Sequence, residues 1–147
     1  MTGESLFTVK GILLVSHGNL AEGMLNTLSY FFSEQMRHVG SLALAMGDAP
    51  ESFKEKLQKK IEDLDSGDGV LVFTDLYGGT PSNTAASLLM TVGESEALTV
   101  ITGFNLPMVM EAMTMNENGP IDVQEILEIG RSGIMCINEV LTNRKKK

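Results

Sequence analysis

The sequence predicts an α/β fold with a mostly parallel sheet and helices on both faces, and two observations predict it. First, five short apolar runs recur along the 147 residues, and each is continuous, which is typical of strands covered on both faces. Second, a pattern with helical spacing separates successive runs, and such alternation favours parallel strands joined by crossover helices. The predicted strands are residues 11–16, 40–45, 69–74, 97–102 and 133–137.

The order of these strands follows from general rules of chain topology. Right-handed crossovers leave few arrangements of five strands, and the flavodoxin-like order 2-1-3-4-5 is expected for a chain of this length. The fifth strand, residues 133–137, then lies at the edge of the sheet, where it would shield the fourth strand. A single domain over residues 1–142, followed by a basic tail over residues 143–147, is expected.

Helices are expected to begin at polar residues that can cap their first turn. In three cases a glutamate three residues further on completes a capping box, and in one case a proline occupies the first turn, where it needs no N–H partner. The expected capping residues are Asn19, Asp48, Thr80, Asn105 and Asp122.

Composition excludes several classes of protein. The net charge of −8 argues against nucleic-acid binding, because phosphate backbones select for lysine and arginine. One cysteine and two histidines argue against a disulfide framework and a structural zinc site. No stretch is long and apolar enough for a membrane span, and residues 1–10 do not resemble a secretory signal. We therefore expect a cytoplasmic protein without a metal or other cofactor.

His17 lies where the first apolar run ends and a helix is expected to begin, an unusual place for a buried structural histidine. Ligands of open α/β sheets bind beyond the carboxyl ends of the strands, where the strand order reverses. In the expected order that point lies between the first and third strands, so His17 and Asp75 follow neighbouring strands roughly 5 Å apart. His38 precedes the second strand and is expected at the opposite edge.

A histidine beside a carboxylate fits several chemistries, and the remaining sequence excludes most of them. No G-x-S-x-G elbow signals a serine nucleophile, and no G-x-G-x-x-G after the first strand or Walker loop signals nucleotide binding. A metal site would need more histidines or carboxylates. The remaining interpretation is that His17 itself is the nucleophile, while Asp75 holds one ring nitrogen and leaves the other free.

The two loops around His17 suit a phosphoryl group. Each leads into a predicted helix N-terminus, whose free N–H groups and positive dipole end favour an anion. Small residues allow the backbone to approach closely, and hydroxyl groups can donate further hydrogen bonds. The alternative is a capped turn beside a solvated histidine. The residues expected to bind the phosphoryl group are Ser16, Gly18, Asn19, Gly78, Gly79 and Thr80.

In combination, four segments resemble the IIA component of the mannose type (mannose, fructose, sorbose) of bacterial phosphoenolpyruvate-dependent sugar phosphotransferase systems. The segments are GILLVSHGNLAEGML (11–25), GVLVFTDLYGGTPSNTAA (69–86), GFNLPMVMEAM (103–113) and GRSGI (130–134). His17 matches the histidine that the family phosphorylates, Asp75 matches the aspartate that orients its ring, and Thr80 matches the hydroxyl residue after the paired glycines.

The resemblance implies a cytoplasmic homodimer of flavodoxin-like subunits that exchange their last strand. It also implies a phosphotransferase that works through phosphohistidine. His17 would accept a phosphoryl group from the histidine phosphocarrier protein and pass it to the IIB component, which phosphorylates sugar brought in by a membrane permease. Because no IIB domain follows LTNRKKK, a stand-alone IIA subunit with separate partners is expected.

Two other functions remain open at this point. The phosphocarrier subunit of dihydroxyacetone kinases shares the fold and a histidine after the first strand, and it would serve a soluble kinase in place of sugar import. A flavodoxin-like binding or regulatory module would use His17 only to contact a small anion. The motifs SHGN and DLYGGTP favour the mannose-type component.

Overall fold

The computed structural model describes residues 9–92 and 97–146, and it has one parallel sheet with the strand order β2-β1-β3-β4. The expectation about a secretory signal concerns residues that lie mostly outside the described ranges. The predicted order is confirmed for the first four strands. These strands are β1 (Gly11–His17), β2 (Val39–Leu44), β3 (Val70–Thr74) and β4 (Leu98–Thr102).

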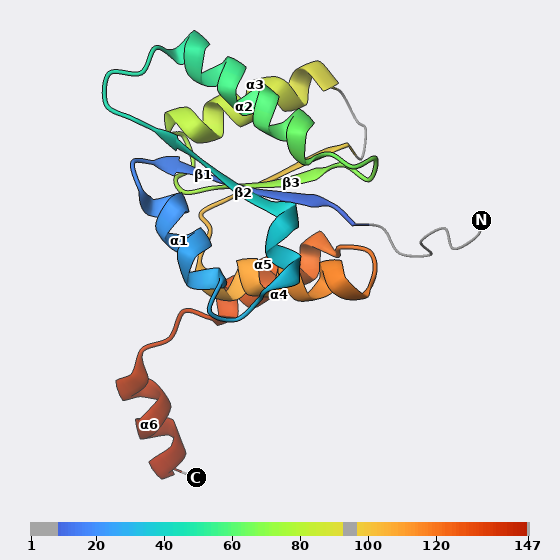
Figure 1. The fold of residues 1–147 in the computed structure, drawn as a ribbon. Coiled ribbons are helices and arrows are strands. Elements are labelled where there is room, and N and C mark those ends of the chain that lie inside the picture. Colours follow the sequence, from blue (N-terminus) through green and yellow to red (C-terminus); the bar gives the residue numbers. More distant parts are fainter. Residues whose placement is uncertain (1–8, 93–96, 147) are drawn as a thin grey trace, which may run out of the picture.

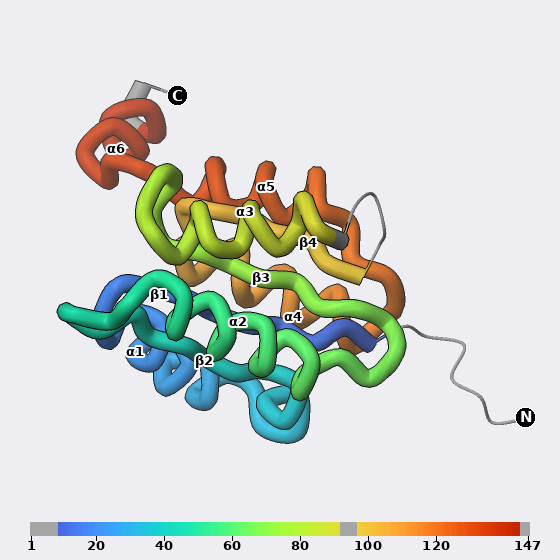
Figure 2. The backbone as a smooth tube through the Cα atoms, turned by 90° about the horizontal axis from the view of Figure 1, so that it is seen from above, coloured from blue at the N-terminus to red at the C-terminus, as the bar shows by residue number. Residues whose placement is uncertain are grey.

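The sheet is covered on both faces, as the continuous apolar runs predicted (Figure 1). Side chains alternate between the faces of a strand, so Leu13 and Val15 of β1 pack against one helix layer, while Ile12 and Leu14 pack against the other. The first layer consists of α2 (Pro50–Leu64) and α3 (Thr80–Val92), and Figure 2 looks onto it. The second consists of α1 (Leu20–Leu28), α4 (Leu106–Asn118) and α5 (Val123–Ser132).

The register places the strand ends that carry the candidate site side by side. In the pairing of β1 with β3, Val15 lies opposite Thr74, so His17 and Asp75 both extend beyond the carboxyl edge. The 3-10 helix η1 (Glu34–His38) ends at the amino end of β2. His38 therefore lies at the edge opposite His17, as predicted. No helix in the described residues is both long and apolar enough to cross a membrane.

The expected helix starts are confirmed at two of the five positions in full detail. Asn105 accepts a hydrogen bond from the N–H of Met108 at 3.1 Å, and Asp122 accepts one from the N–H of Glu125 at 3.3 Å. Asn19 occupies the N-cap position of α1 without a side-chain cap hydrogen bond. Asp48 accepts from the N–H of Ala45 and thus shapes the turn before α2, whose N-cap is Ala49. Thr80 is the first residue of α3 itself.

The prediction of a fifth strand at residues 133–137 is wrong for the single chain. Residues 134–136 form a short connection that leads from α5 to helix α6 (Ile137–Lys146), and Figure 1 shows α6 standing away from the sheet. Ile134, Met135 and Ile137 are 75%, 68% and 71% exposed. A strand needs a neighbour to receive its backbone hydrogen bonds, and within the described chain this segment reaches none. The expected basic tail continues α6 as far as Lys146.

Candidate active site

His17 and Asp75 meet at the carboxyl edge of the two inner strands, as the sequence predicted. His17 is the last residue of β1, and Asp75 directly follows β3. Nδ1 of the imidazole lies 2.9 Å from Oδ2 of Asp75, and the backbone N–H of His17 donates to the same oxygen at 3.0 Å. These two contacts fix both the backbone and the ring of His17 against one carboxylate oxygen.

The contact with Asp75 determines which ring nitrogen of His17 is free. An ionised carboxylate can only accept, so Nδ1 must carry the proton that points at Oδ2. In a neutral imidazole, Nε2 then has no proton and presents its lone pair. The His17 side chain is 46% exposed, whereas that of Asp75 is only 10% exposed. The arrangement therefore combines a largely shielded carboxylate with a half-exposed ring whose Nε2 is free of protons in the neutral form.

The surroundings of Asp75 keep its carboxyl group ionised. Burial alone would raise its pKa, but the hydrogen bonds from the ring and backbone of His17, and the charge of the imidazole when protonated, outweigh burial. The pKa of Asp75 is thereby lowered from its ordinary value of 3.8. Its charge is consequently present throughout the neutral range.

This lowered pKa predicts a pH dependence of stability. The unfolded chain binds a proton at Asp75 more readily than the folded chain, so the contribution of this group is complete above about pH 5 and is lost as the pH falls through the lowered pKa. Urea unfolding of the wild type and Asp75→Asn between pH 3 and 6 measures it. As the pH falls below about 4, we expect the free energy of unfolding to decrease less steeply for Asp75→Asn than for the wild type. Parallel pH profiles of the two proteins would contradict this.

Two glycines in the loops around His17 have a backbone conformation that favours glycine. Gly18 and Gly78 have φ angles of 54° and 86°, in the left-handed region that side chains other than glycine rarely adopt. The N–H of Gly18 donates to the carbonyl of Leu44 at 2.9 Å, and that of Gly79 donates to the carbonyl of Leu76 at 3.0 Å. These two N–H groups are therefore engaged in shaping the loops.

Thr80 retains open donors at the N-terminus of α3. It is exposed, and within the described ranges neither its N–H nor its hydroxyl has a protein partner. The N–H of Asn19 at the start of α1 is likewise without one among the described residues. Of the residues expected to bind a phosphoryl group, Thr80, Asn19 and Gly78 thus carry N–H donors without a partner among the described residues.

Ser16 differs from the expectation that its hydroxyl contacts the phosphoryl group. The residue is fully buried, and its Oγ accepts from the N–H of Ala21 at 2.7 Å while donating to the carbonyl of Gly18 at 3.3 Å. The one hydroxyl proton is thus already used. Ser16 satisfies a first-turn N–H of α1 and fixes the turn in which His17 stands.

Four exposed apolar side chains belong to segments that follow strands at the sheet edge where His17 lies, namely Leu20, Met46, Leu76 and Tyr77. The site predicted from the sequence includes none of them. Met46, Leu76 and Tyr77 lie in the loops after β2 and β3, and Leu20 is the first residue of α1, which follows β1. They could have been identified in the sequence as large apolar residues in the segments that directly follow predicted strands. We call these four residues the apolar collar.

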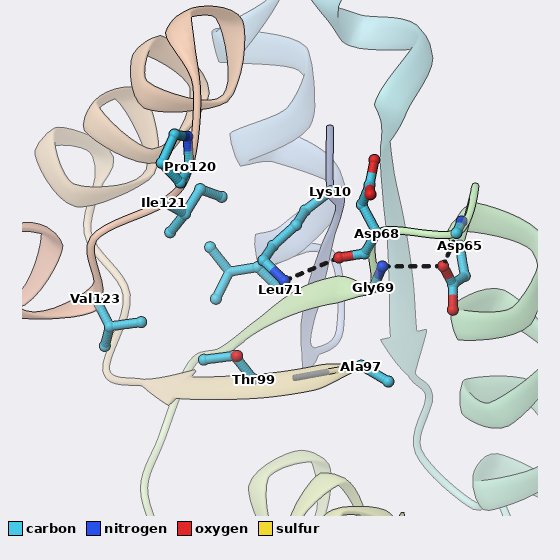
Figure 3. A pocket seen from close by; sticks show the side chains of 11 residues that line it. Lys10, Asp65, Asp68, Gly69, Leu71, Ala97, Thr99, Pro120, Ile121 and Val123 are labelled. Atoms are coloured by element: carbon cyan, nitrogen blue, oxygen red, sulfur yellow. Dashed lines mark hydrogen bonds between the residues drawn. The ribbon is translucent and has the colours of Figure 1, made fainter. Parts of the chain in front are cut away.

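The cavity drawn in Figure 3 lies at the other edge of the sheet. It measures about 600 Å³ and is lined by Lys10, Asp65 and Asp68 with residues before α5, among others. Lys10 Nζ donates to the carbonyl of Asp68 at 2.9 Å, and Asp65 accepts from the N–H of Gly69. None of the predicted site residues lines this cavity. No cluster of three metal-ligating side chains occurs among the described residues.

Comparison with known proteins agrees with the sequence resemblance. The family model EIIA-man, described as "PTS system fructose IIA component", matches residues 11–128. The "PTS system mannose-specific EIIAB component" of Escherichia coli (strain K12) is 30% identical over 129 residues, which cover 86% of this chain but only 39% of the relative. The chain is also 24% identical to the "PTS system fructose-specific EIIA component" of Bacillus subtilis, covering 73% of this chain and 70% of the relative.

Solved structures show the same relationship. The PTS IIA protein associated with the fucose utilization operon from Streptococcus pneumoniae matches with a TM-score of 0.81 and 30% identity, covering 92% of this chain and 98% of the other. The mannose/sorbose specific IIA subunit from Enterococcus faecalis matches with a TM-score of 0.70 and 28% identity, covering 87% and 94%. The chain therefore belongs to the EIIA-man family of phosphotransferase-system IIA components.

Proposed function

We propose that this protein is a cytoplasmic phosphoryl carrier, in which His17 accepts a phosphoryl group from the histidine phosphocarrier protein and passes it to a IIB component. The observation that carries the proposal is the contact of Nδ1 with Asp75, which leaves Nε2 of a half-exposed ring as the free nucleophile. Family membership supplies the context of sugar-specific phosphoryl transfer.

The proposed transfer exchanges one P–N bond for another and needs no cofactor. The lone pair of His17 Nε2 forms a bond to phosphorus as the bond between phosphorus and the ring nitrogen of the donor breaks, and the donor ring keeps that electron pair. Such transfers pass through a loose transition state, so positioning and charge stabilisation dominate. Asp75 faces the positive charge that develops on the His17 ring, while Thr80 and Asn19 can donate to the phosphoryl oxygens.

The accessibility of the site supports donors and acceptors that are proteins. A small phosphorylated metabolite would be held best in a deep pocket with convergent polar groups, whereas His17 is half-exposed and lies at the same sheet edge as the apolar collar. Exposed apolar and aromatic side chains around a reactive group are typical of protein interfaces. A membrane permease would take part only indirectly, through the IIB component.

The experiment for this proposal is phosphorylation with a defined chain of donors. The protein is incubated with phosphoenolpyruvate, enzyme I and the phosphocarrier protein, and its intact mass is measured before and after brief acid treatment. We expect one phosphoryl group, which acid removes because the P–N bond is labile. Absence of the added group, or an acid-stable one, would contradict the proposal.

We also propose that the protein is a homodimer held partly by its C-terminal segment. Ile134, Met135, Ile137 and Leu141 are exposed in the single chain, and β4 is an outer strand whose other edge has no partner among the described residues. A strand edge and an apolar segment that are both unpartnered can satisfy each other across two subunits. Exchange of the segment between subunits, as the family resemblance implies, is one form of such pairing.

Two truncations test the dimer. Deletion of residues 133–147 removes the exposed apolar segment, and we expect a monomer, an aggregate or an unfolded chain in place of a dimer. Deletion of residues 143–147 leaves those apolar residues in place and is expected to leave the dimer unchanged. Light scattering measures both. A stable dimer without residues 133–147 would place the subunit contact elsewhere.

A further inference from the structure

The His17 ring leaves no room for a side chain at Gly79. A Cβ atom built at Gly79 would lie 2.6 Å from Cε1 and 3.2 Å from Nε2 of His17, and 3.3 Å from the carbonyl oxygen of Leu76. Contacts under 3.0 Å essentially never occur at real Cβ atoms, so an added methyl group would force a displacement. The edge of the ring that carries the free nitrogen therefore lies directly against the Cα of Gly79.

The backbone itself does not require glycine at this position. Gly78 has a φ of 86° and nothing near its missing Cβ, so its glycine is needed for conformation. Gly79 has no such positive φ, and only space limits the residue there. Two neighbouring glycines thus meet two different requirements, and the second requirement comes from His17.

Neither Gly79 nor His17 can move aside without losing hydrogen bonds. The N–H of Gly79 donates to the carbonyl of Leu76 at 3.0 Å, and its carbonyl accepts from the N–H of Asn83 at 2.9 Å. On the other side, Asp75 holds both the ring and the backbone of His17. The ring is therefore confined between a carboxylate at Nδ1 and a bare Cα beside Cε1 and Nε2.

We propose that Gly79 is a positioning residue for phosphoryl transfer, a role that rests on the proposed function of His17. The missing side chain lets the ring approach Asp75 and keeps the space beside Nε2 clear. In the transfer step, Nε2 bonds to phosphorus as the donor's P–N bond breaks, and the oxygens of the arriving group need this space. A methyl group there either turns the ring away from Asp75 or occupies that volume.

The first test compares Gly79→Ala with Gly23→Ala, whose added Cβ meets nothing within 4 Å on the neighbouring helix α1. Phosphoryl transfer from the phosphocarrier protein is measured as kcat and KM, and nitrogen NMR of the imidazole reports the tautomer of His17. We expect Gly79→Ala to lower kcat by about 10²-fold with a smaller change in KM, because small misplacements of a reacting group have such effects. The tautomer signal should shift in this variant, and Gly23→Ala should match the wild type in both readouts.

A second test depends on neither catalysis nor full stability of the variant. If the added Cβ at position 79 collides with the His17 ring, then removing the ring must relieve the collision. Gly79→Ala should lower the melting temperature in the wild-type background and lower it less in a His17→Ala background. An equal loss in both backgrounds, or wild-type transfer by Gly79→Ala, would overturn the proposal. If the wild type accepts no phosphoryl group, the proposed function fails, while this cycle still decides whether Gly79 positions the ring.

Discussion

His17→Ala is expected to accept no phosphoryl group from the phosphorylated carrier, the largest effect of any single substitution in this protein. The substitution removes Nε2, the nitrogen that the contact between Nδ1 and Asp75 leaves free. No other described histidine lies at this edge of the sheet, since His38 ends η1 at the amino edge. Because the His17 side chain is half-exposed, the fold should survive its loss. Labelling with phosphoenolpyruvate, enzyme I and the carrier measures the effect.

His38→Gln is the matched control for His17→Ala. This histidine lies beside Arg37 at the far edge, where burial and then the neighbouring guanidinium lower its pKa. Because distant sites act independently, the variant should be labelled within about twofold of the wild-type rate. Normal labelling of His17→Ala, or loss of labelling in His38→Gln, would refute the assignment of the nucleophile.

Asp75→Asn is expected to have the second-largest effect on transfer. One carboxylate oxygen accepts from both the ring and the backbone of His17, and the other, Oδ1, is buried without a partner among the described residues. If the amide oxygen replaces Oδ2, the amide nitrogen takes the place of Oδ1, which has no partner among the described residues. The negative charge that stabilises the phosphorylated ring is then lost. If the amide is reversed, its N–H faces Nδ1, which can then accept only with the proton on Nε2.

Either orientation of the introduced amide slows the reaction while the fold remains. The same substitution in a serine-protease triad lowers turnover by about 10⁴-fold, and the loss here is expected to be smaller because no proton is shuttled. Rapid-quench measurement of phosphoryl transfer to the folded variant gives the rate. An unchanged rate would remove Asp75 from the mechanism and leave it a structural role at the end of β3.

Much of the framework was predictable because it depends on local pattern and on topology. Four continuous apolar runs correctly predicted four strands, of which the two inner ones, β1 and β3, are buried, and the rule for strand order placed His17 beside Asp75 from the sequence alone. Caps with a clear local signature, such as Asn105 and Asp122, were also predicted correctly. These features depend on residues close in sequence or on a few general rules of chain connection.

The features that the sequence did not reveal depend on what surrounds a residue. Residues 133–137 read as a strand because they are apolar, yet within the described residues this segment leads from α5 to α6 and pairs with no strand edge. Ser16 was expected to face the phosphoryl group, but its hydroxyl is directed to Ala21 and Gly18, which no spacing rule encodes. The different needs for glycine at positions 78 and 79 likewise emerge only from φ angles and from the position of the His17 ring.

Phosphorus and nitrogen NMR of the phosphorylated wild-type protein shows directly whether Nε2 of His17 carries the phosphoryl group. Coupling between phosphorus and a single imidazole nitrogen identifies the atom that is bonded. We expect coupling to Nε2 of His17, with Nδ1 still protonated and facing Asp75. Coupling to Nδ1, to His38 or to no imidazole at all would contradict this assignment.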